Sequence, residues 1–269
     1  MLESLPKIPR GREKLSRVIQ YAGDIVRIED AEKALGLDRL EASKLLSRWT
    51  GQGWLRRVGA GAYAPVPIDS LQSKQVLGDP WVLVPVLFAP AYIGGRTAAE
   101  HWDLTEQIFR DIVVFTARNV RSKNQERHGA VFTLKHCAEE KQFGTRTIWR
   151  EKTRVNLSDI HRTVIDMLAE PSIGGGIQHV DDCFAQYLNR PDADYKQLLS
   201  YAARLNNGAV FKRLGFLAER KNAPAAIISE CQAALTKGNV KLDPSMKCPR
   251  LITRWRLFVP ETWAGARND

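Results

Sequence analysis

The stretch that most constrains the fold of this chain is Asp38–Tyr63, which reads DRLEASKLLSRWTGQGWLRRVGAGAY. Its first half predicts a helix over Arg39–Gln52 with Asp38 as the N-cap residue, because apolar residues recur at helical spacing along one stripe. The stripe comprises Ala42, Leu45, Leu46 and Trp49. One side of this helix is therefore expected to pack, whereas the opposite side is free to contact another molecule.

The second half of the stretch predicts a basic hairpin. Gly51 and Gly53 are expected to end the helix, and Trp54–Val58 reads as a strand that turns at Gly59–Gly61 into Ala62–Ala64. A helix followed by such a hairpin is typical of the recognition end of a winged helix-turn-helix.

Two further helices are expected before this stretch, over Arg12–Ala22 and Ile28–Leu35. Together these elements predict a complete winged helix-turn-helix DNA-binding domain over residues 1–66. The residues Pro65 and Pro67 and the polar run Asp69–Gln75 then predict a domain boundary.

The charge of the chain favours a polyanionic partner. With 269 residues, a formal net charge of +10 and a pI near 9.6, the chain is suited to nucleic acid, because cations that neutralise phosphates release condensed counterions. An anionic membrane is a weaker alternative, since the longest apolar run, Trp81–Gly94, is too short to span a bilayer and contains Pro85 and Pro90. Met1–Arg12 lacks the apolar segment of a signal peptide, so a cytoplasmic protein is expected.

The cysteines and histidines give no metal-binding pattern. Cys137, Cys183, Cys231 and Cys248 are scattered without CxxC pairs, which predicts reduced thiols in the core rather than disulfides or zinc ligands. The histidines form no HxxxH or HxH pair. We therefore expect neither a metal ion nor another cofactor.

A larger second domain is expected over residues 72–269, so that the whole chain is of the α+β class. Its first part predicts a helix beginning at Asp79-Pro80, a short helix over Thr97–Trp102 and a small antiparallel sheet. The expected strands are Asp111–Ala117, Ala130–His136 and Arg146–Arg150, with the charged loop Arg118–His128 between them.

The second part of this domain is expected to be helical. Helices are predicted from the N-cap residue Ser158 to Pro171, from Gly174–Gly176 to Leu188, and over Tyr195–Leu205, Ala209–Glu219 and Pro224–Leu235. The alternation in Arg250–Val259 predicts a closing strand whose open face carries Arg250, Arg254 and Arg256. That face is a candidate second surface for a polyanion or an acidic partner, and a solvated edge strand is the alternative.

Enzyme signatures are incomplete. Tyr92–Gly95 followed by Asp111–Val114 is superficially similar to a nucleotidyltransferase, but Val113 occupies the second carboxylate position, and one carboxylate does not hold two metal ions. A nuclease site built from Glu100, Asp111 and Lys135 is the other enzyme alternative, although its spacing is loose. We assign no catalytic residue and expect a protein that is not an enzyme.

The candidate DNA contacts lie on the open side of the Arg39–Gln52 helix and on the hairpin. Three residues near the helix N-terminus are expected to reach base edges, namely Arg39, Ser43 and Lys44. Three cations are expected to bind phosphates, namely Arg48, Arg56 and Arg57. The full set of candidates is Arg39, Leu40, Ser43, Lys44, Ser47, Arg48, Arg56, Arg57, Gly59 and Gly61. The alternative is a solvated face in a winged-helix module that binds protein.

Several segments in order resemble one known family, the AbiEi-type antitoxins. These segments are GWLRRVGAGAYAPVP, YIGGRTAAEHWDLTEQ, DIVVFTA, NLSDIHRTVIDMLAEPSIGGGIQHV, FKRLGFLAE, KLDPS and RWRLFVP. The resemblance extends from about Ser16 to Val259, although each motif is a structural pattern without a catalytic signature. The chain departs from the family at Ile93-Gly94, where the usual pair is Ile-Ser.

AbiEi-type antitoxins are the transcriptional-regulator half of abortive-infection, type IV toxin–antitoxin pairs. The resemblance implies that the N-terminal winged helix binds inverted repeats in the promoter of its own operon and represses it. It also implies that the C-terminal domain opposes a nucleotidyltransferase toxin without forming a stable complex with it. On this interpretation the protein is a monomer in solution that binds promoter DNA in more than one copy.

Overall fold

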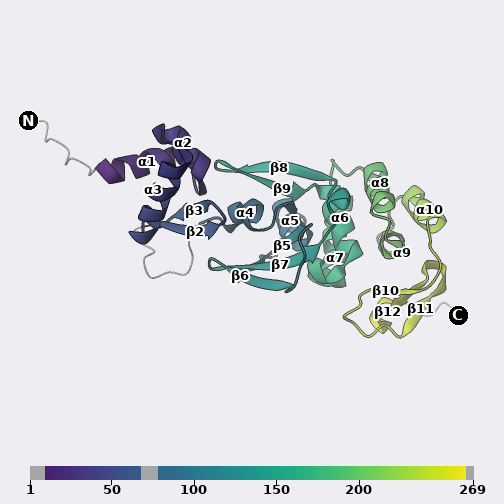
Figure 1. The fold of residues 1–269 in the computed structure, drawn as a ribbon. Coiled ribbons are helices and arrows are strands. Elements are labelled where there is room, and N and C mark those ends of the chain that lie inside the picture. Colours follow the sequence, from purple (N-terminus) through teal and green to yellow (C-terminus); the bar gives the residue numbers. More distant parts are fainter. Residues whose placement is uncertain (1–9, 68–77, 265–269) are drawn as a thin grey trace, which may run out of the picture.

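The computed structural model describes residues 10–67 and 78–264, which form a mixed α+β fold. A small N-terminal unit lies at one end, a sheet in the middle, and helices with a second small sheet at the other end (Figure 1). The predicted boundary run Asp69–Gln75, the start of the second domain at residue 72 and most of Met1–Arg12 lie outside the described residues. Among the described helices, none is long and apolar enough to cross a bilayer.

The N-terminal unit contains the helices and the hairpin that the sequence predicts. Its elements are α1 (Arg10–Ala22), β1 (Val26–Arg27), α2 (Ile28–Leu35), α3 (Arg39–Gly51), β2 (Leu55–Gly59) and β3 (Ala62–Pro65). The strands form an antiparallel sheet in the order β1-β3-β2. The predicted stripe of α3 faces inward, since Ala42, Leu46 and Trp49 are buried with Val18 of α1. This arrangement is compatible with a winged helix-turn-helix.

The start of α3 is fixed by its own sequence. The Asp38 carboxylate accepts a hydrogen bond from the Glu41 backbone N–H at 2.8 Å, which confirms the predicted N-cap. The Glu41 side chain in turn accepts from the Asp38 backbone N–H at 3.4 Å, completing a capping box. Gly36, at φ 64°, supplies the left-handed turn between α2 and α3.

The middle of the chain is built on a mixed sheet of six strands, so the predicted small antiparallel sheet is wrong. Its strands are β4 (Ala91–Ile93), β5 (Asp111–Thr116), β6 (Asn124–Arg127), β7 (Ala130–His136), β8 (Thr145–Arg150) and β9 (Thr153–Ser158), in the order β6-β7-β5-β4-β9-β8. β5 pairs with β7, and β4 with β9, in parallel. The helical elements before and beside the sheet are η2 (Pro80–Leu83), α4 (Val84–Leu87) and α5 (Gly95–His101).

Two of the strands that were not predicted have weak local signals. β4 has only three residues, and β6 is an exposed polar strand inside the predicted loop Arg118–His128. β9 ends at Ser158, so this residue is not the N-cap of the following helix. Asp159 takes that position instead, and its carboxylate accepts from the Arg162 backbone N–H at 2.8 Å.

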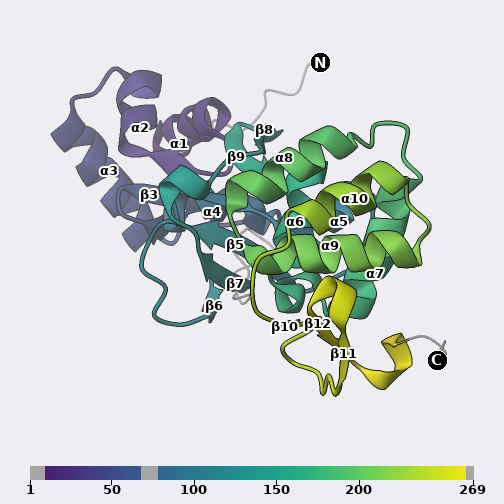
Figure 2. The same ribbon diagram turned by 90° about the vertical axis from the view of Figure 1, so that its right-hand side faces the viewer.

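The helical part follows the predicted order and packs around the largest described apolar cluster. Its elements are α6 (Ile160–Ala169), η4 (Pro171–Gly174), α7 (Ile177–Leu188), α8 (Tyr195–Leu205), α9 (Gly208–Arg220) and α10 (Ala225–Ala233). Figure 2 looks onto this end of the molecule and shows α8, α9 and α10 lying in front of the sheet. Buried residues of α6 include Val164, Ile165 and Leu168.

The predicted single strand Arg250–Val259 is wrong. The segment forms a hairpin of β11 (Arg250–Ile252) and β12 (Leu257–Val259), joined by η5 (Thr253–Trp255). Arg256 reverses the chain at φ 52°, a conformation that interrupts any strand. β10 (Val240–Lys241) pairs in parallel with β12, and η6 (Glu261–Trp263) follows the hairpin.

The N-terminal unit is seated against the six-stranded sheet at several points. Val58 and Ala64 share an apolar cluster with Val82 and Leu83. A ring nitrogen of His128, in the β6–β7 turn, lies 3.2 Å from the Val58 carbonyl oxygen. Beyond β8, the Lys152 ammonium group donates to backbone carbonyl oxygens at the end of α1. The two predicted domains therefore share part of their core.

Candidate nucleic-acid interface

The side of α3 opposite the core is open to solvent. Lys44, Ser47 and Arg48 are exposed, Ser43 is half-buried, and Leu40 is 63% exposed although it is a large apolar residue. This distribution follows from the amphipathic pattern, because the residues between the buried stripe positions must face outward. The predicted contact face is thus presented as one helical surface with two cations, two hydroxyl groups and one apolar side chain.

The structure places Arg39 differently from the other candidates. Its guanidinium group forms an ion pair with Glu29 of α2 at 2.7 Å and lies 4.0 Å from Glu32. The hydrogen bond to Glu29 raises the pKa of Arg39, and two carboxylates offset the positive charge locally. Arg39 therefore links the start of α3 to α2 through an exposed ion pair, and its contact with a base stays a prediction.

The two glycines of the β2–β3 turn are half-buried, and each has a neighbour in another element. A Cβ atom added at Gly59 would lie 2.7 Å from Cγ1 of Val86 in α4, which is too close for any side chain. Gly61 adopts φ 64° and lies against Ile28 of α2. Packing at Gly59 and backbone conformation at Gly61 are each a structural reason for a glycine at that position. Only Ala60 of this turn is exposed.

The cations of β2 remain near the surface. Arg57 is exposed, and its Nε donates to the Gly59 carbonyl oxygen at 3.2 Å, which holds the side chain along the strand. Arg56 is half-buried. Both residues lie on the strand that follows α3, so the hairpin adds positive charge beside the helix.

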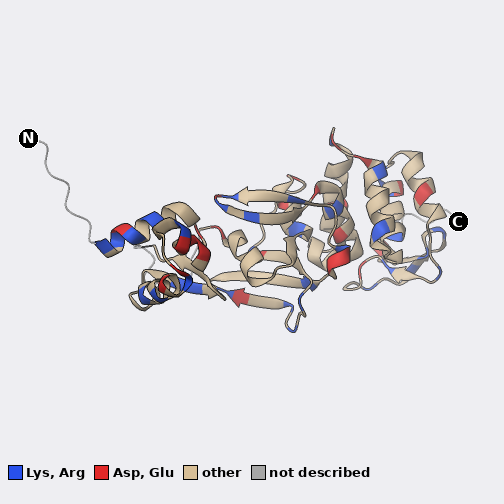
Figure 3. Cartoon of the chain, turned by 45° about the horizontal axis from the view of Figure 1, so that its top comes forward, with Lys and Arg blue, Asp and Glu red and all other residues tan. Residues whose placement is uncertain are grey.

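Sequence reasoning missed a group of cations on α1. The first turn of this helix lies against Trp54, the residue that precedes β2, since the Cβ position of Gly11 is 3.6 Å from the Trp54 ring. Exposed cations of α1 are Arg10, Arg12, Lys14 and Arg17, of which Arg17 pairs with Glu13 at 3.0 Å. Figure 3 shows Lys and Arg along α1 and on the neighbouring α3 and β2. The spacing RxRxK in the sequence was the available signal.

The three C-terminal arginines do not form the predicted common face. Arg250 is exposed on β11. Arg254 pairs with Glu219 of α9 at 2.7 Å, and this carboxylate also accepts from the Trp255 indole N–H at 2.8 Å. Arg256 donates to the Thr236 carbonyl oxygen at 2.9 Å. Two of the three guanidinium groups thus have intramolecular partners.

Asp111, which belongs to both enzyme alternatives, is engaged in intramolecular contacts. The Asp111 carboxylate is bound by Arg96 and accepts a hydrogen bond from the Thr133 hydroxyl group. Lys135 lies four positions further along the sheet, opposite Phe115, and pairs with Glu170. Within residues 10–67 and 78–264, no three His, Cys, Asp or Glu side chains are grouped to hold a metal ion.

The four cysteines are free and buried. Burial raises the pKa of Cys183 and Cys231 to about 12, so both thiols stay protonated and unreactive at neutral pH.

One family model matches the N-terminal unit. Residues 13–66 match the model of a family described as "Transcriptional regulator, AbiEi antitoxin". The matched segment runs from α1 to the end of the β2–β3 hairpin, so the sequence resemblance to AbiEi antitoxins is confirmed over these residues. A search of curated proteins gave no match.

The fold is similar to a solved structure over almost its whole length. The crystal structure of the RV2827C protein from Mycobacterium tuberculosis superposes with a TM-score of 0.59 at 14% sequence identity. The similarity covers 93% of this chain and 92% of that chain. At this level of identity the comparison establishes a shared architecture and no shared activity.

Proposed function

We propose that this protein is a DNA-binding antitoxin that represses its own toxin–antitoxin operon. The observation that carries the proposal is the family match over residues 13–66, which falls on the unit whose α3 presents an open, cationic face. A DNA-binding regulator needs such a face, because a recognition helix enters the major groove with its polar side toward the bases.

In this proposal the N-terminal unit is a winged helix-turn-helix over residues 1–66. Lys44 and Ser43 reach base edges from the first half of α3, together with the exposed Leu40. Arg48, Arg57 and the α1 cations bind phosphates on either side of the groove. Arg39 acts as a positioning residue through its ion pair with Glu29.

The remainder, residues 72–269, is the proposed antitoxin domain. It opposes a nucleotidyltransferase toxin as in type IV abortive-infection systems, without a stable complex and without cofactors or catalysis of its own. The protein acts in the cytoplasm, where a promoter with inverted repeats binds more than one copy. The family likeness supports this assignment, and the incomplete enzyme signatures agree with it.

The test is a salt titration of binding to the promoter upstream of the operon, with footprinting of the protected bases. Arg48→Ala and Arg57→Ala should each weaken binding to all sequences and reduce the salt slope by about one unit. Lys196→Ala is the matched control, because it removes an exposed charge of α8, at the opposite end of the molecule. Unchanged affinity and slope in both test variants would contradict the proposed docking.

The antitoxin part has its own test. The neighbouring reading frame should encode a nucleotidyltransferase, and co-expression of the full chain should relieve its toxicity. Arg48→Ala should lose repression and keep this protection, because the two activities are assigned to different parts of the chain. Loss of protection in this variant would contradict the assignment of repression and protection to different parts of the chain.

A further inference from the structure

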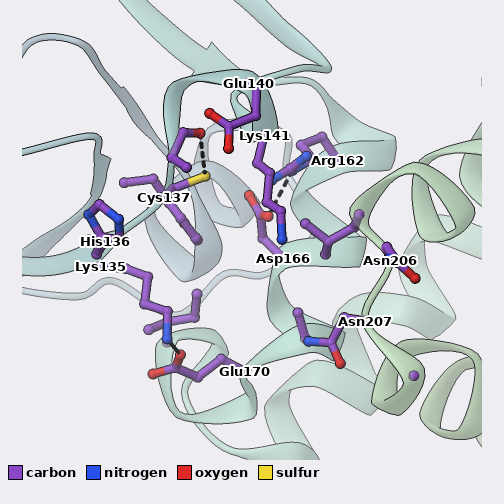
Figure 4. Close-up of a pocket in the computed structure, with 16 residues that line it drawn as sticks. Lys135, His136, Cys137, Glu140, Lys141, Arg162, Asp166, Glu170, Asn206 and Asn207 are labelled. Atoms are coloured by element: carbon purple, nitrogen blue, oxygen red, sulfur yellow. Dashed lines mark hydrogen bonds and ion pairs between the residues drawn. The ribbon is translucent and has the colours of Figure 1, made fainter.

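A cavity of about 560 Å³ lies outside the proposed DNA-binding unit. It opens just beyond the carboxyl end of β7, between Lys135–Ala138, the helix α6 and the turn Asn206–Gly208 that joins α8 to α9. Figure 4 shows His136 and Cys137 on one side of this cavity and Asn206 and Asn207 on the other. The carboxyl ends of parallel strands, here β5 and β7, are a common place for ligands in sheet proteins.

The floor of the cavity carries a buried guanidinium group with an unused donor. Arg162 is 1% exposed, and its Nε donates to the Asp166 carboxylate at 2.8 Å while Nη2 donates to the Tyr92 hydroxyl oxygen at 3.0 Å. Its Nη1 has no hydrogen-bond partner in the described part of the chain. Buried donors are paired in most proteins, and leaving one unpaired costs roughly 1–3 kcal/mol. An acceptor is therefore expected at Nη1.

The aromatic neighbours of Arg162 do not supply that acceptor. The guanidinium carbon lies 4.2 Å from the centre of the Phe143 ring, which covers a face of the group. A ring beneath the guanidinium plane leaves its in-plane N–H groups without a lone pair to bind. The Phe143 ring is shared with Arg204, whose guanidinium carbon lies 4.0 Å away. The lining of the cavity carries the cations Lys135, Lys141 and Arg162 and the carboxylates Glu140, Asp166 and Glu170, of which Asp166 pairs with Arg162 and Glu170 with Lys135.

The walls of the cavity add donors from separate elements. Lys141 is exposed and forms no ion pair among the described residues, and Figure 4 shows its side chain beside Arg162 and Asp166. Lys135 lies across from it and pairs with Glu170. The opposite wall is the N-terminus of α9, a helix of 13 residues whose dipole favours an anion. Asn207 caps this helix by accepting from the Ala209 N–H at 3.1 Å.

We propose that this cavity binds a small ligand through its phosphate group, with Arg162 at the floor, Lys141 at the mouth and the α9 N-terminus opposite. A guanidinium group, an ammonium group and a helix N-terminus match the several oxygens of a phosphate better than the two of a carboxylate. The volume exceeds that of inorganic phosphate alone and is in the range of small-molecule sites, so the ligand carries a larger group as well. The site is separate from the proposed DNA contacts.

The test is isothermal titration of the full-length protein with pyrophosphate, in parallel with succinate as a dicarboxylate. The wild-type protein should bind pyrophosphate and show at least tenfold weaker affinity for succinate. Lys141→Ala should weaken pyrophosphate binding by about tenfold, the value of one hydrogen bond to a charged group, with an unchanged melting temperature. Arg48→Ala is the matched control for phosphate binding at the proposed DNA surface, and it should bind pyrophosphate like the wild type.

Arg162→Lys tests the floor, since it keeps the charge but removes the forked donors; pyrophosphate affinity should fall at least tenfold. Should this variant fail to fold, the Lys141→Ala and Arg48→Ala pair still decides the location of the site. The proposal is overturned by absence of pyrophosphate binding at millimolar concentration, by equal affinity for succinate, or by a loss in Arg48→Ala that Lys141→Ala does not show.

Discussion

At the scale of single residues, the exposed leucine of α3 is the least expected member of the proposed interface. Leu40 is 63% exposed and lies between Arg39, which is held by Glu29, and the free cation Lys44. An apolar side chain at this place is suited to the methyl group of thymine, the one apolar feature of base pairs in the major groove.

We predict that Leu40→Ala relaxes sequence preference without changing stability. Replacing one operator thymine by uracil removes only its methyl group, which should weaken wild-type binding by about 0.8 kcal/mol, or roughly fourfold. The same replacement should have no effect on Leu40→Ala. Binding titrations with each operator thymine substituted in turn measure this. An identical uracil profile for the two proteins would remove Leu40 from the base contacts.

The buried carboxylate Asp166 gives a pH dependence at the same scale. Desolvation raises its pKa from 3.8 to about 6, against the opposing effect of Arg162. Between these values the folded state keeps a proton that the unfolded state has released, so the free energy of unfolding falls as the pH rises from about 4 to 6. Above pH 6 the contribution is constant.

We predict that Asp166→Asn removes this loss. The free energy of unfolding of the wild type, relative to the variant, should fall by up to about 3 kcal/mol between pH 4 and pH 7. Urea unfolding of both proteins across this range measures the difference. The control is Asp182→Asn, at an exposed position of α7, which keeps Asp166. The stability of the wild type relative to this control should show no such trend. If the stability of the wild type relative to Asp166→Asn increased as the pH rises, the predicted sign would be contradicted.

At the scale of elements, the cap of α3 links local sequence to the proposed function. The side chains of Asp38 and Glu41 satisfy two backbone N–H groups that have no carbonyl partner within the helix. We predict that Asp38→Ala costs about 1 kcal/mol of stability, whereas Asp38→Ser retains most of it, because serine also caps helices. Urea unfolding measures both. Equal losses in the two variants would show that the cap contributes little.

Elements with strong local signals were predictable from the sequence. The helices α2 and α8 and the strand β7 have the expected bounds, because caps, glycines and apolar periodicity all lie within the segment. β4 and β9 were missed because their parallel pairing joins Ile93 to Leu157, a partner far along the chain. Local periodicity cannot specify such a partner.

The candidate interface, too, was predictable from the sequence only in part. The open side of α3 followed from helical spacing, and the structure presents Lys44 and Arg48 there. The engagement of Arg39 by Glu29 and the packing of Gly59 against Val86 were not predictable, since each depends on how two elements meet. Residue type alone therefore did not indicate which candidates have intramolecular contacts.

At the scale of the whole molecule, the N-terminal unit is held in one orientation. α4, the β6–β7 turn and the segment after β8 each contact it, at Gly59, Val58 and the end of α1. Figure 1 shows both hairpins of the six-stranded sheet extending toward this unit. The direction of α3 is consequently fixed relative to the proposed antitoxin domain. A change at the junction should therefore affect both the N-terminal unit and that domain.

The glycine at this junction allows a test by double-mutant cycle. A Cβ atom at position 59 would overlap Cγ1 of Val86 at 2.7 Å, so Gly59→Ala should destabilise the protein by about 1–3 kcal/mol. Val86→Ala removes the overlapping methyl group, and the double variant should recover most of that loss. Gly61→Ala is the control: its φ of 64° costs roughly 1 kcal/mol for any residue with a Cβ, and Val86→Ala should not relieve it. Additive effects of Gly59→Ala and Val86→Ala in urea unfolding would mean that the unit is not anchored through this contact.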